Sequence, residues 1–507
     1  MNTVFEAAEL GRKLSKQEYS DRVPALRTEL LAGQRELGEA GFSMLVLLGG
    51  MDGAGRSETA NLLHSWMDAR FLTAHAFGPP SEEERDRPEF WRYWMSLPPA
   101  GRTGIYIDTW YTAPIVQRTF EEIDDDTLDA SMDRIANLER MLADDGILVV
   151  KLWLHIGRKR QAKRLKKLAK DPLTRWRVDA RQEELLRRYD QRRRAAERAL
   201  RLTSTGQTPW TVIEADNVRY RNVAVALTVQ QRLAQHLHAQ REPSAVALPP
   251  TTVATNGTLL PTRSILDQLD LSRTIEDDAY DQALTEAQEN FARLALEAKQ
   301  AHVSTTVVFE GWDAAGKGGC IRRLIRALDA RFFRVIPIAA PTDEELSHHY
   351  LWRFWRHIPR AGHMTIYDRS WYGRVLVERV EELATPTQWG RAYKEINDFE
   401  EQLVDRGIVL LKFWLHISQD EQLRRFEERK RIPWKQHKIT DEDWRNRERA
   451  PQYEVAVTEM VERTSTEYAP WTLVAAEDKH SARIEVLQTV CAALRSALER
   501  AKTSERS

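Results

Sequence analysis

The feature that most constrains this chain of 507 residues is a long internal repeat. Blocks of the first half recur in the second half at a constant shift of 261 residues, as from Gly50 to Gly311. The matching blocks are Gly50–Arg56 with Gly311–Lys317, Asp68–Phe71 with Asp329–Phe332, Phe90–Trp94 with Leu351–Trp355, Ile105–Tyr111 with Ile366–Tyr372, Gly146–Ile156 with Gly407–Ile417, and Pro209–Thr211 with Pro470–Thr472. A period of this length indicates a duplicated domain and not a solenoid.

A segment rich in Pro and Thr separates the two copies. It runs from Glu242 to Thr262 and contains Asn256-Gly257, a dipeptide typical of turns. Such a composition is typical of an interdomain linker. The sequence therefore predicts a first domain over residues 1–240, a linker over 241–262 and a second domain over 263–507.

Within each copy, short apolar and β-branched segments alternate with segments of helical period. Short strands of this kind are typical of parallel strands that are buried on both faces. The expected order is helix, strand, glycine loop, helix, short strand, a Trp-rich helical segment, strand, long helix, strand, basic helices, strand and helix. Helical crossovers between parallel strands are right-handed by default. We therefore expect a three-layer α/β fold with its functional residues at the carboxyl ends of the strands.

The second copy carries a glycine loop after an apolar run. Val307–Phe309 leads into a GxxxxGK sequence at Gly311–Lys317, and a helix is predicted over Cys320–Arg331. Strand, glycine loop and helix form the context in which this sequence indicates a phosphate-binding loop. Backbone N–H groups and a helix N-terminus favour phosphate there, and the lysine adds a mobile charge. The candidate phosphate-binding residues of the loop are Gly311, Gly316, Lys317, Gly318 and Gly319.

One position departs from the ordinary phosphate-binding loop. A serine or threonine usually follows the lysine and holds Mg²⁺, whereas Gly318 stands there in this chain. Another residue must then hold the metal, and Asp313 inside the loop is the nearest candidate. The departure indicates a loop built for an unusual phosphate donor.

A second candidate carboxylate follows a later strand. Asp368 ends an apolar run in the sequence Thr365–Ser370, where a metal-holding Walker B aspartate belongs. Alone such an aspartate is weak evidence, but the glycine loop upstream strengthens it. We therefore predict that Asp313 and Asp368 place the metal. Arg322, Arg369 and Arg374 are candidate clamps for phosphate oxygens, with a surface ion pair as the alternative for each.

A basic stretch, Arg424–Lys438, includes the candidate phosphate-binding residues Arg431 and Lys435. Runs of this kind are usually solvated helix faces or nucleic-acid patches. Here Pro433 and Trp434 interrupt the helical pattern, as expected for a hinged lid over a phosphate site. Closure of such a lid would keep water from the donor phosphate.

The two copies do not carry the same candidate residues. The corresponding pairs are Lys317 with Arg56, Asp368 with Ile107, Arg369 with Asp108, and Asp313 with Asp52. A planar guanidinium does not replace a lysine in a tight loop, and isoleucine is no metal ligand. We therefore expect the second copy to be catalytic and the first to be a diverged scaffold. The alternative is a second polyanion-binding site, because Arg56 still offers positive charge.

Composition limits the class and the location of the protein. A net charge of −1, with 42% apolar and 30% charged residues, is typical of a soluble globular protein, so any attraction to a polyanion must come from local clusters. The two cysteines, Cys320 and Cys491, form no CxxC, which argues against structural zinc and against a disulfide framework. The N-terminus shows no signal-peptide pattern and no apolar run could span a membrane. We expect a cytoplasmic protein.

Several of these motifs together resemble those of the polyphosphate kinase 2 family. They are the GxDxxGKG loop at Gly311–Gly318, the block Tyr367–Tyr372, the strand Lys412–Ile417 and the Arg-rich lid with Trp434 and Lys435. The loop with glycine after the lysine is quite specific, and the resemblance covers nearly the whole chain. The fused arrangement with an intact second copy is similar to the subgroup that transfers phosphate from polyphosphate to AMP.

The resemblance implies two tandem P-loop kinase-like domains of the thymidylate-kinase type, each with a parallel sheet and a basic helical lid. It implies transfer of the terminal phosphoryl group of polyphosphate to AMP, giving ADP, with Mg²⁺ and with Mn²⁺ as the alternative ion. Asp313, Lys317, Asp368 and Arg369 would be catalytic or metal-binding, and the basic residues of the lid would hold the phosphate chain. It also implies a homodimer, without nucleic acid or membrane as a partner.

Other interpretations of these motifs stay open. The acceptor could be ADP, GMP or GDP. An ATP-dependent nucleotide kinase has the same fold class, although Gly318 argues against ATP as the donor. A non-catalytic polyanion-binding scaffold would use the basic lids and the sixteen tryptophans as stacking platforms. Most tryptophans, such as Trp153 and Trp414, fall in repeated apolar blocks, which favours packing in the core.

Overall fold

The structure is a computed structural model that describes residues 4–241, 264–433, 436 and 439–504. The described chain forms two compact units: the first lies within residues 1–80, 92–247 and 342–349, and the second within 81–91, 248–341 and 350–507. The predicted linker, 241–262, lies outside the described residues except for its first one. Domain boundaries near 240 and 263 therefore stay predictions.

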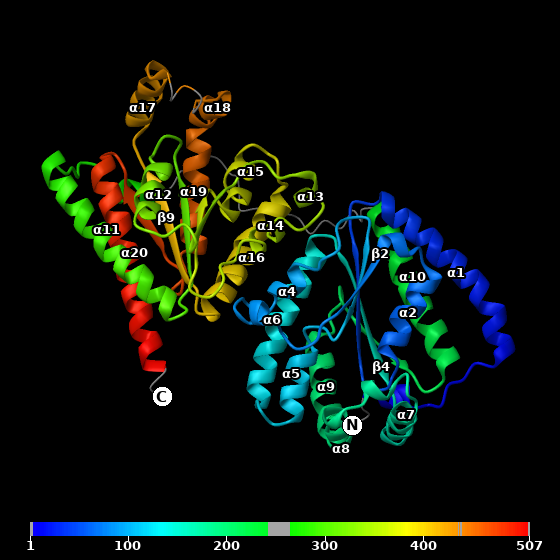
Figure 1. The fold of residues 1–507 in the computed structure, drawn as a ribbon. Helices are drawn as coiled ribbons and strands as arrows, with labels where there is room; N and C mark the ends of the chain where they lie inside the picture. The colour runs from blue at the N-terminus through cyan, green and yellow to red at the C-terminus, as the bar shows by residue number, and fades with distance from the viewer. Residues whose placement is uncertain (1–3, 242–263, 434–435, 437–438, 505–507) are drawn as a thin grey trace. The chain divides into compact units, whose positions relative to one another are not determined.

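Each unit contains a five-stranded parallel sheet (Figure 1). The strands of the first sheet are β1 Met44–Gly50, β2 Leu72–Ala76, β3 Thr103–Ile107, β4 Leu148–His155 and β5 Trp210–Glu214. Those of the second are β6 Thr305–Gly311, β7 Phe333–Pro337, β8 Met364–Asp368, β9 Val409–His416 and β10 Trp471–Ala475. The orders, β2-β3-β1-β4-β5 and β7-β8-β6-β9-β10, are the same. The predicted α/β fold and its duplication are confirmed.

Helices connect the strands in the predicted sequence order. In the first copy they are α1 Lys16–Glu39, α2 Arg56–Trp66, α3 Glu82–Arg85, α4 Trp91–Trp94, α5 Thr112–Thr119, α6 Asp125–Asp144, α7 Arg158–Lys170, α8 Ala180–Arg187, α9 Tyr189–Thr203 and α10 Val218–Arg241. In the second they are α11 Asp277–Gln300, α12 Lys317–Arg326, α13 Asp343–Leu346, α14 Trp352–Trp355, α15 Val377–Val380, α16 Pro386–Asp405, α17 Gln419–Arg431, α18 Asp441–Glu448, α19 Ala450–Thr464 and α20 Lys479–Ser504.

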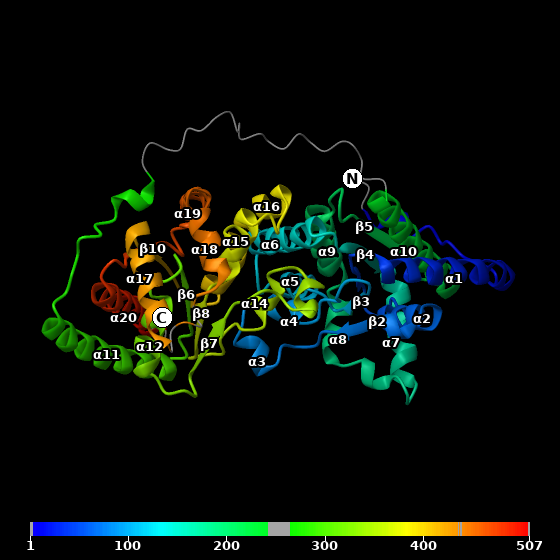
Figure 2. The same cartoon turned by 90° about the horizontal axis from the view of Figure 1, so that it is seen from above.

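The helices form two layers around each sheet, as the two views show (Figures 1 and 2). In the first unit, α1, α2 and α10 pack together, and α5, α6 and α9 form the other group. In the second unit, α11, α12 and α20 form one group and α15, α16 and α19 the other. The long apolar faces of these helices cover strands that are buried almost throughout, such as β1. The fold is therefore a three-layer sandwich in each unit.

One buried ion pair recurs in both cores. Lys412 on β9 donates to Glu400 at 2.7 Å and to the carbonyl of Thr464 at 2.7 Å, with both charged side chains fully buried. Lys151 and Glu139 form the same 2.7 Å pair in the first copy. A buried charge must be paired and hydrogen-bonded, because an unpaired one costs several kcal/mol, roughly 3–5. The pair therefore fixes β9 against α16 and β4 against α6.

The helix after the glycine loop differs from its predicted bounds. It covers Lys317–Arg326 instead of Cys320–Arg331. Gly318 and Gly319 fit its first turn because the N–H groups there need no partner within the helix. Beyond Arg326 the chain turns, and the Asp329 carboxylate accepts the N–H of Arg331 at 2.9 Å. Within the described residues, no helix combines the length and the apolar character needed to cross a membrane.

Candidate active site

The glycine loop and Asp368 come together at the carboxyl edge of the second sheet. The loop follows β6 and Asp368 ends β8, and these strands are neighbours in which Phe309 pairs with Asp368. After these two strands the chain continues toward opposite edges of the sheet, since β6 is followed by β7 at one edge and β8 is followed by β9 on the other side of β6. Parallel α/β sheets bind ligands at such a point.

Two glycines of the loop serve different purposes. Gly311 has a φ of +145°, and a Cβ on it would lie 2.4 Å from the carbonyl oxygen of Leu415, so no side chain fits. Gly316 has a φ of +114° and precedes α12, and a Cβ there would meet nothing within 4 Å. Gly311 thus lets the loop leave the sheet, and Gly316 borders open space at the helix N-terminus. That space is where an anion would meet the helix dipole.

Lys317 bridges the base of the loop. Its Nζ donates to the carbonyl oxygens of Gly311 at 2.7 Å and Trp312 at 3.2 Å. These bonds hold the loop closed on itself and keep the ammonium group in the lining of the cleft. The positive charge is thus positioned before any substrate arrives, which lowers the cost of reorganisation.

Asp313 carries a mostly buried carboxylate with two partners. Its Oδ1 accepts from Arg369 at 3.2 Å and its Oδ2 accepts from Asn446 on α18 at 2.8 Å. Burial by itself would raise the pKa of Asp313, but the charge of Lys317 and then that of Arg369 outweigh it. The net pKa lies below the usual value, so this carboxylate is ionised at neutral pH.

Asp368 differs from Asp313 in having open oxygens. Among the described residues, no donor or cation lies within hydrogen-bond or ion-pair distance of its side chain, which lines the cleft. The next residue, Arg369, has a φ of +66°, and its counterpart Asp108 has a φ of +56°. Both copies therefore keep the same left-handed turn after the strand, but only the second presents a carboxylate and a guanidinium there.

Glu310 is a site residue that the sequence reasoning missed. Its side chain is buried beside the loop and accepts from the hydroxyl of Ser370 at 2.8 Å. Burial raises its pKa above the usual value, although Ser370 and then Lys317 oppose that shift. Gly49 occupies the corresponding position in the first copy. That replacement is the signal in the sequence that could have identified Glu310.

Arg425 on α17 anchors the loop, and the first copy has an equivalent arginine. It donates to the carbonyls of Ala314 and Ala315 at 3.0 Å each, and to Ala476 at 2.7 Å. In the first copy, Arg164 likewise donates to Gly53 at 2.8 Å. Because both copies have this contact, we infer that it supports the loop in its conformation. It also attaches α17, the first part of the predicted lid, to the loop.

These elements enclose a cleft of about 560 Å³. Its lining includes seven basic and four acidic side chains, an excess of positive charge. They are Lys317, Arg322, Arg369, Arg425, Arg429, Lys479 and Arg483, with Asp313, Asp368, Glu428 and Asp443. Gly316, Gly318 and Gly319 complete the loop side. A protein chain whose net charge is −1 thus concentrates positive charge at one place, which suits a polyanionic ligand.

Three predicted phosphate-binding residues lie apart from this cleft lining. Gly311 lies beneath the loop. Arg374 pairs with Glu378 at 3.1 Å and lies over the ring of Tyr350 at 4.4 Å. Arg431 ends α17, where its side chain is 81% exposed. Lys435, like Trp434, lies outside the described residues.

The corresponding loop of the first copy is filled by its own side chains. Arg56 forms ion pairs with Asp108 and, at 3.1 Å, with Asp52, and Arg192 also binds Asp52. Arg221 donates to the carbonyl of Ala54 at 3.1 Å. The Asp52 carboxylate, which is the counterpart of Asp313, is thus paired with two arginines.

Comparison with known proteins agrees with the motifs. The family model for polyphosphate kinase 2 matches residues 13–241 and again residues 274–502. The chain belongs to the polyphosphate kinase 2 family. It contains two tandem domains of that family, as the repeat predicted.

Relatives match over most or all of their own length and across both copies of this chain. A polyphosphate:AMP phosphotransferase of Pseudomonas aeruginosa is 46% identical over 98% of this chain and 100% of the relative. One of Acinetobacter johnsonii is 35% identical over 88% of this chain and 90% of the relative. A crystal structure described as a polyphosphate kinase 2 of Pseudomonas aeruginosa superposes with a TM-score of 0.87 at 43% identity, covering 98% of this chain and 99% of that one.

Proposed function

We propose that this protein transfers the terminal phosphoryl group of inorganic polyphosphate to AMP and releases ADP. The observation that carries the proposal is the basic cleft around a GxDxxGKG loop in the second copy. The full-length relatives named polyphosphate:AMP phosphotransferases support the choice of donor and acceptor.

The cleft offers what a polyphosphate donor requires. Polyphosphate carries charge along its whole length and has no base, so it needs cations along a groove. Arg322, Lys479 and Arg483 line the cleft beside the loop, and the corresponding residues of the first copy are Asn61, Val218 and Asn222. We propose that these residues, with Arg369 and the loop N–H groups, hold the terminal phosphates. Arg431 and Lys435 would bind phosphates further along the polyphosphate chain.

The carboxylates of the cleft fit a magnesium ion that arrives with the substrate. Within the described residues, no group of three metal-ligating side chains is present. Mg²⁺ usually needs only one or two carboxylates when substrate phosphates supply the remaining ligands. Asp368 has open oxygens for this purpose, and Asp313 lies in the same lining. When bound, Mg²⁺ would neutralise charge on the phosphate oxygens.

Transfer to AMP requires positioning more than proton removal. The second pKa of a phosphate monoester is about 6, so the acceptor oxygen is already largely deprotonated at neutral pH. The residues then have to hold donor and acceptor in line, neutralise charge and exclude water. We propose that Lys317 and Arg369 stabilise the charge of the transferred group, and that Asp313 orients Arg369 through their 3.2 Å contact.

We propose that the first copy takes no part in the chemistry and serves as a scaffold. Its loop is occupied by its own arginines, and it lacks a counterpart of Asp368. Both cysteines are free and buried, which accords with a reducing compartment, so we propose the cytoplasm as the location. A homodimer is a further proposal, tested by the mass of the protein in solution.

Product analysis tests the donor and the acceptor together. The protein is incubated with Mg²⁺, AMP and long-chain polyphosphate without ATP, and in parallel with GMP, GDP or ADP as the acceptor, or ATP as the donor. We expect ADP to form fastest from AMP and polyphosphate. ADP that forms only with ATP would establish the nucleotide-kinase alternative. Polyphosphate binding on a gel without any nucleotide product would establish the scaffold alternative.

A further inference from the structure

A turn outside the active site has the same geometry in both copies. In the first copy, the carboxylate of Asp68 accepts the N–H of Arg70 at 3.0 Å, and its carbonyl accepts the N–H of Phe71 at 3.1 Å. In the second copy, Asp329 accepts from Arg331 at 2.9 Å and from Phe332 at 3.0 Å. The two backbones can therefore be compared atom by atom.

In the first copy a glutamine side chain completes this turn. Gln34 on α1 accepts the N–H of Asp68 at 2.7 Å and donates to its carbonyl oxygen at 3.0 Å. The Gln34 side chain is buried, and both bonds are partly shielded from water. The turn thus binds one amide edge, a donor beside an acceptor, in a two-bond pair.

In the second copy the glutamine is absent. Ala295 stands at the position of Gln34, and Ala327 stands at that of Trp66. Within the described residues, the N–H of Asp329 has no hydrogen-bond partner, and its carbonyl accepts only from Phe332. Asp329 is an exposed residue, so these two backbone groups are open to water when no ligand is bound. The second copy therefore presents an unused amide-binding edge.

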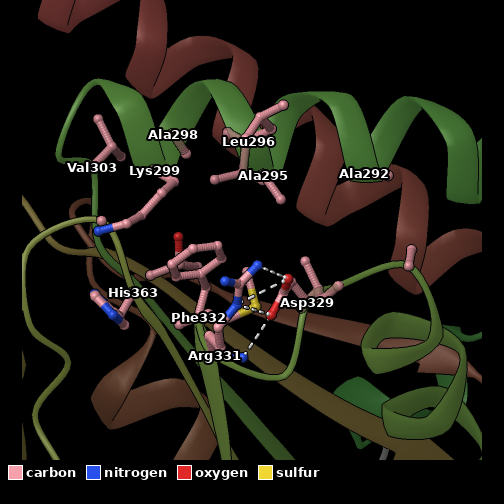
Figure 3. Close-up of a pocket in the computed structure, with 16 residues that line it drawn as sticks. Ala292, Ala295, Leu296, Ala298, Lys299, Val303, Asp329, Arg331, Phe332 and His363 are labelled. Atoms are coloured by element: carbon pink, nitrogen blue, oxygen red, sulfur yellow. Dashed lines mark hydrogen bonds and ion pairs between the residues drawn. The ribbon is translucent and has the colours of Figure 1, made fainter.

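A cavity of about 300 Å³ lies where the larger side chains are missing. Figure 3 shows Ala295 and Leu296 of α11 facing Phe332, Arg331 and Asp329 across it. Most of the remaining lining is apolar, with alanines at 292, 298 and 327. An apolar cavity with a few directed polar groups is the usual form of a small-molecule site.

The lining of the cavity also provides an aromatic ring and a positive charge. The Nζ of Lys299 lies 5.3 Å from the centre of the Phe332 ring. In the described part of the chain, no carboxylate lies within ion-pair distance of Lys299, whereas Arg331 is held by Asp329 at 2.6 Å. A flat aromatic ligand could pack on Phe332, and Lys299 has a charge available for a phosphate.

This cavity is distinct from the active-site cleft. The two share no lining residue. Thr305 and Met364 in its wall begin β6 and β8, so it lies at the amino ends of the strands whose carboxyl ends form the active site. Helix α12 runs from the glycine loop toward Ala327 and connects the two regions.

We propose that this cavity is a second, non-catalytic binding site for the purine base of a nucleoside or nucleotide. The base would present an amide-type edge to the backbone of Asp329. An acceptor atom of the base would accept the N–H of Asp329, and a donor of the base would bind its carbonyl oxygen, as Gln34 does at Asp68. Both purines have a suitable edge, since adenine carries an amino donor next to a ring nitrogen and guanine a ring N–H next to a carbonyl. The ring packs on Phe332, and a phosphate, where present, reaches Lys299. The proposal does not depend on the proposed reaction.

Hydrogen exchange of the two turns tests the unused edge in the full-length protein. We expect the amide of Asp329 to exchange faster than that of Asp68. Ala295→Gln should slow exchange at Asp329, and Gln34→Ala should speed exchange at Asp68. Ala295→Met fills the same space without an amide and should leave Asp329 fast. Equal protection of the two amides in the unmodified protein would overturn the proposal.

Calorimetry with adenosine and with guanosine tests the ligand and distinguishes the two purines. These probes lack phosphate and so avoid the main binding contribution of the glycine loop. We expect at least one of them to bind, to protect the amide of Asp329, and to lose affinity about tenfold or more in Ala295→Gln and in Ala295→Met. If adenosine binds, N6,N6-dimethyladenosine should not protect that amide, since it lacks the donor.

Thr285→Gln, an exposed change on the same helix, is the control and should bind as the unmodified protein does. Glutamine and methionine are both good helix formers, so none of these three variants on α11 should unfold the protein. The proposal is overturned if neither nucleoside protects Asp329, or if binding is the same in Ala295→Gln and the control.

Discussion

The guanidinium of Arg221 covers Gly55 in the first copy of the phosphate loop. A Cβ on Gly55 would lie 1.7 Å from Nη1 of Arg221, whereas a Cβ on Gly316 would meet nothing within 4 Å. Ala482 stands at the position of Arg221 in the second copy and lines the cleft. One loop is therefore filled by its own chain and the other is open to a ligand.

An arginine in place of Ala482 should block the phosphate loop of the second copy. We expect Ala482→Arg to lower turnover about 10²-fold or more, because a guanidinium would occupy the space beside Gly316 that the terminal phosphate needs. The rate of ADP formation at saturating substrate measures the loss. Arg221→Ala is the matched change in the first copy and should leave the rate within about twofold. Full activity of Ala482→Arg would show that the space beside Gly316 is not used.

Asp368 should determine the requirement for magnesium. We expect Asp368→Asn to lower kcat about 10²-fold or more and to raise the Mg²⁺ concentration at half-maximal rate, since the amide keeps the shape but has no negative charge. A titration of the rate against Mg²⁺ measures both effects. Asp398→Asn removes a carboxylate that pairs with Lys394 on α16 and serves as the control. An unchanged Mg²⁺ requirement in Asp368→Asn would exclude Asp368 as a metal ligand.

Glu310 should make stability depend on pH. Its folded pKa is raised by burial above the unfolded value of about 4.3, so the folded state binds the proton more tightly. The stability from this group is complete below the unfolded pKa and is lost as pH rises through the folded pKa. We therefore expect the unmodified protein to lose stability relative to Glu310→Gln as pH rises from about 4. Thermal unfolding of both proteins over that range measures the difference, and a constant difference would contradict the assignment.

The Lys412–Glu400 pair should be structural. Lys412→Met leaves Glu400 as an unpaired buried charge and should destabilise the second unit by about 3–5 kcal/mol. Adding Glu400→Leu should restore part of that loss, because replacing a whole buried pair by apolar residues is often neutral. Denaturant unfolding measures each variant. If Lys412→Met proves as stable as the unmodified protein, the pair does not have this structural role.

The sequence predicted the elements that local patterns determine. The repeat indicated two equal domains, and the apolar strands and the GxxxxGK sequence indicated a phosphate loop at the edge of a parallel sheet. Asp368 ends its strand as predicted, because it is the first charged residue after a short apolar run. The roles assigned to the individual site residues stay predictions.

The parts that the sequence did not reveal depend on contacts between distant segments. Asn446 reaches Asp313 across 133 residues, and no local pattern marks it. Arg221 covers Gly55 from the end of another helix, although its replacement by Ala482 could have been noticed. Arg374 fits the composition of a phosphate clamp, yet Glu378 and Tyr350 hold it elsewhere. Which arginine faces a ligand is decided by packing and not by residue type.

The central claim is that one copy carries the chemistry, and the paired variants Lys317→Ala and Arg56→Ala test it most directly. ADP formation from AMP and polyphosphate is measured for both and for the unmodified protein, with unfolding curves to show that each variant is folded. We expect Lys317→Ala to lose about 10²–10³-fold in kcat, as when one preorganised donor is removed, and Arg56→Ala to stay within about twofold. Comparable losses in the two variants would contradict the account and place chemistry in both copies.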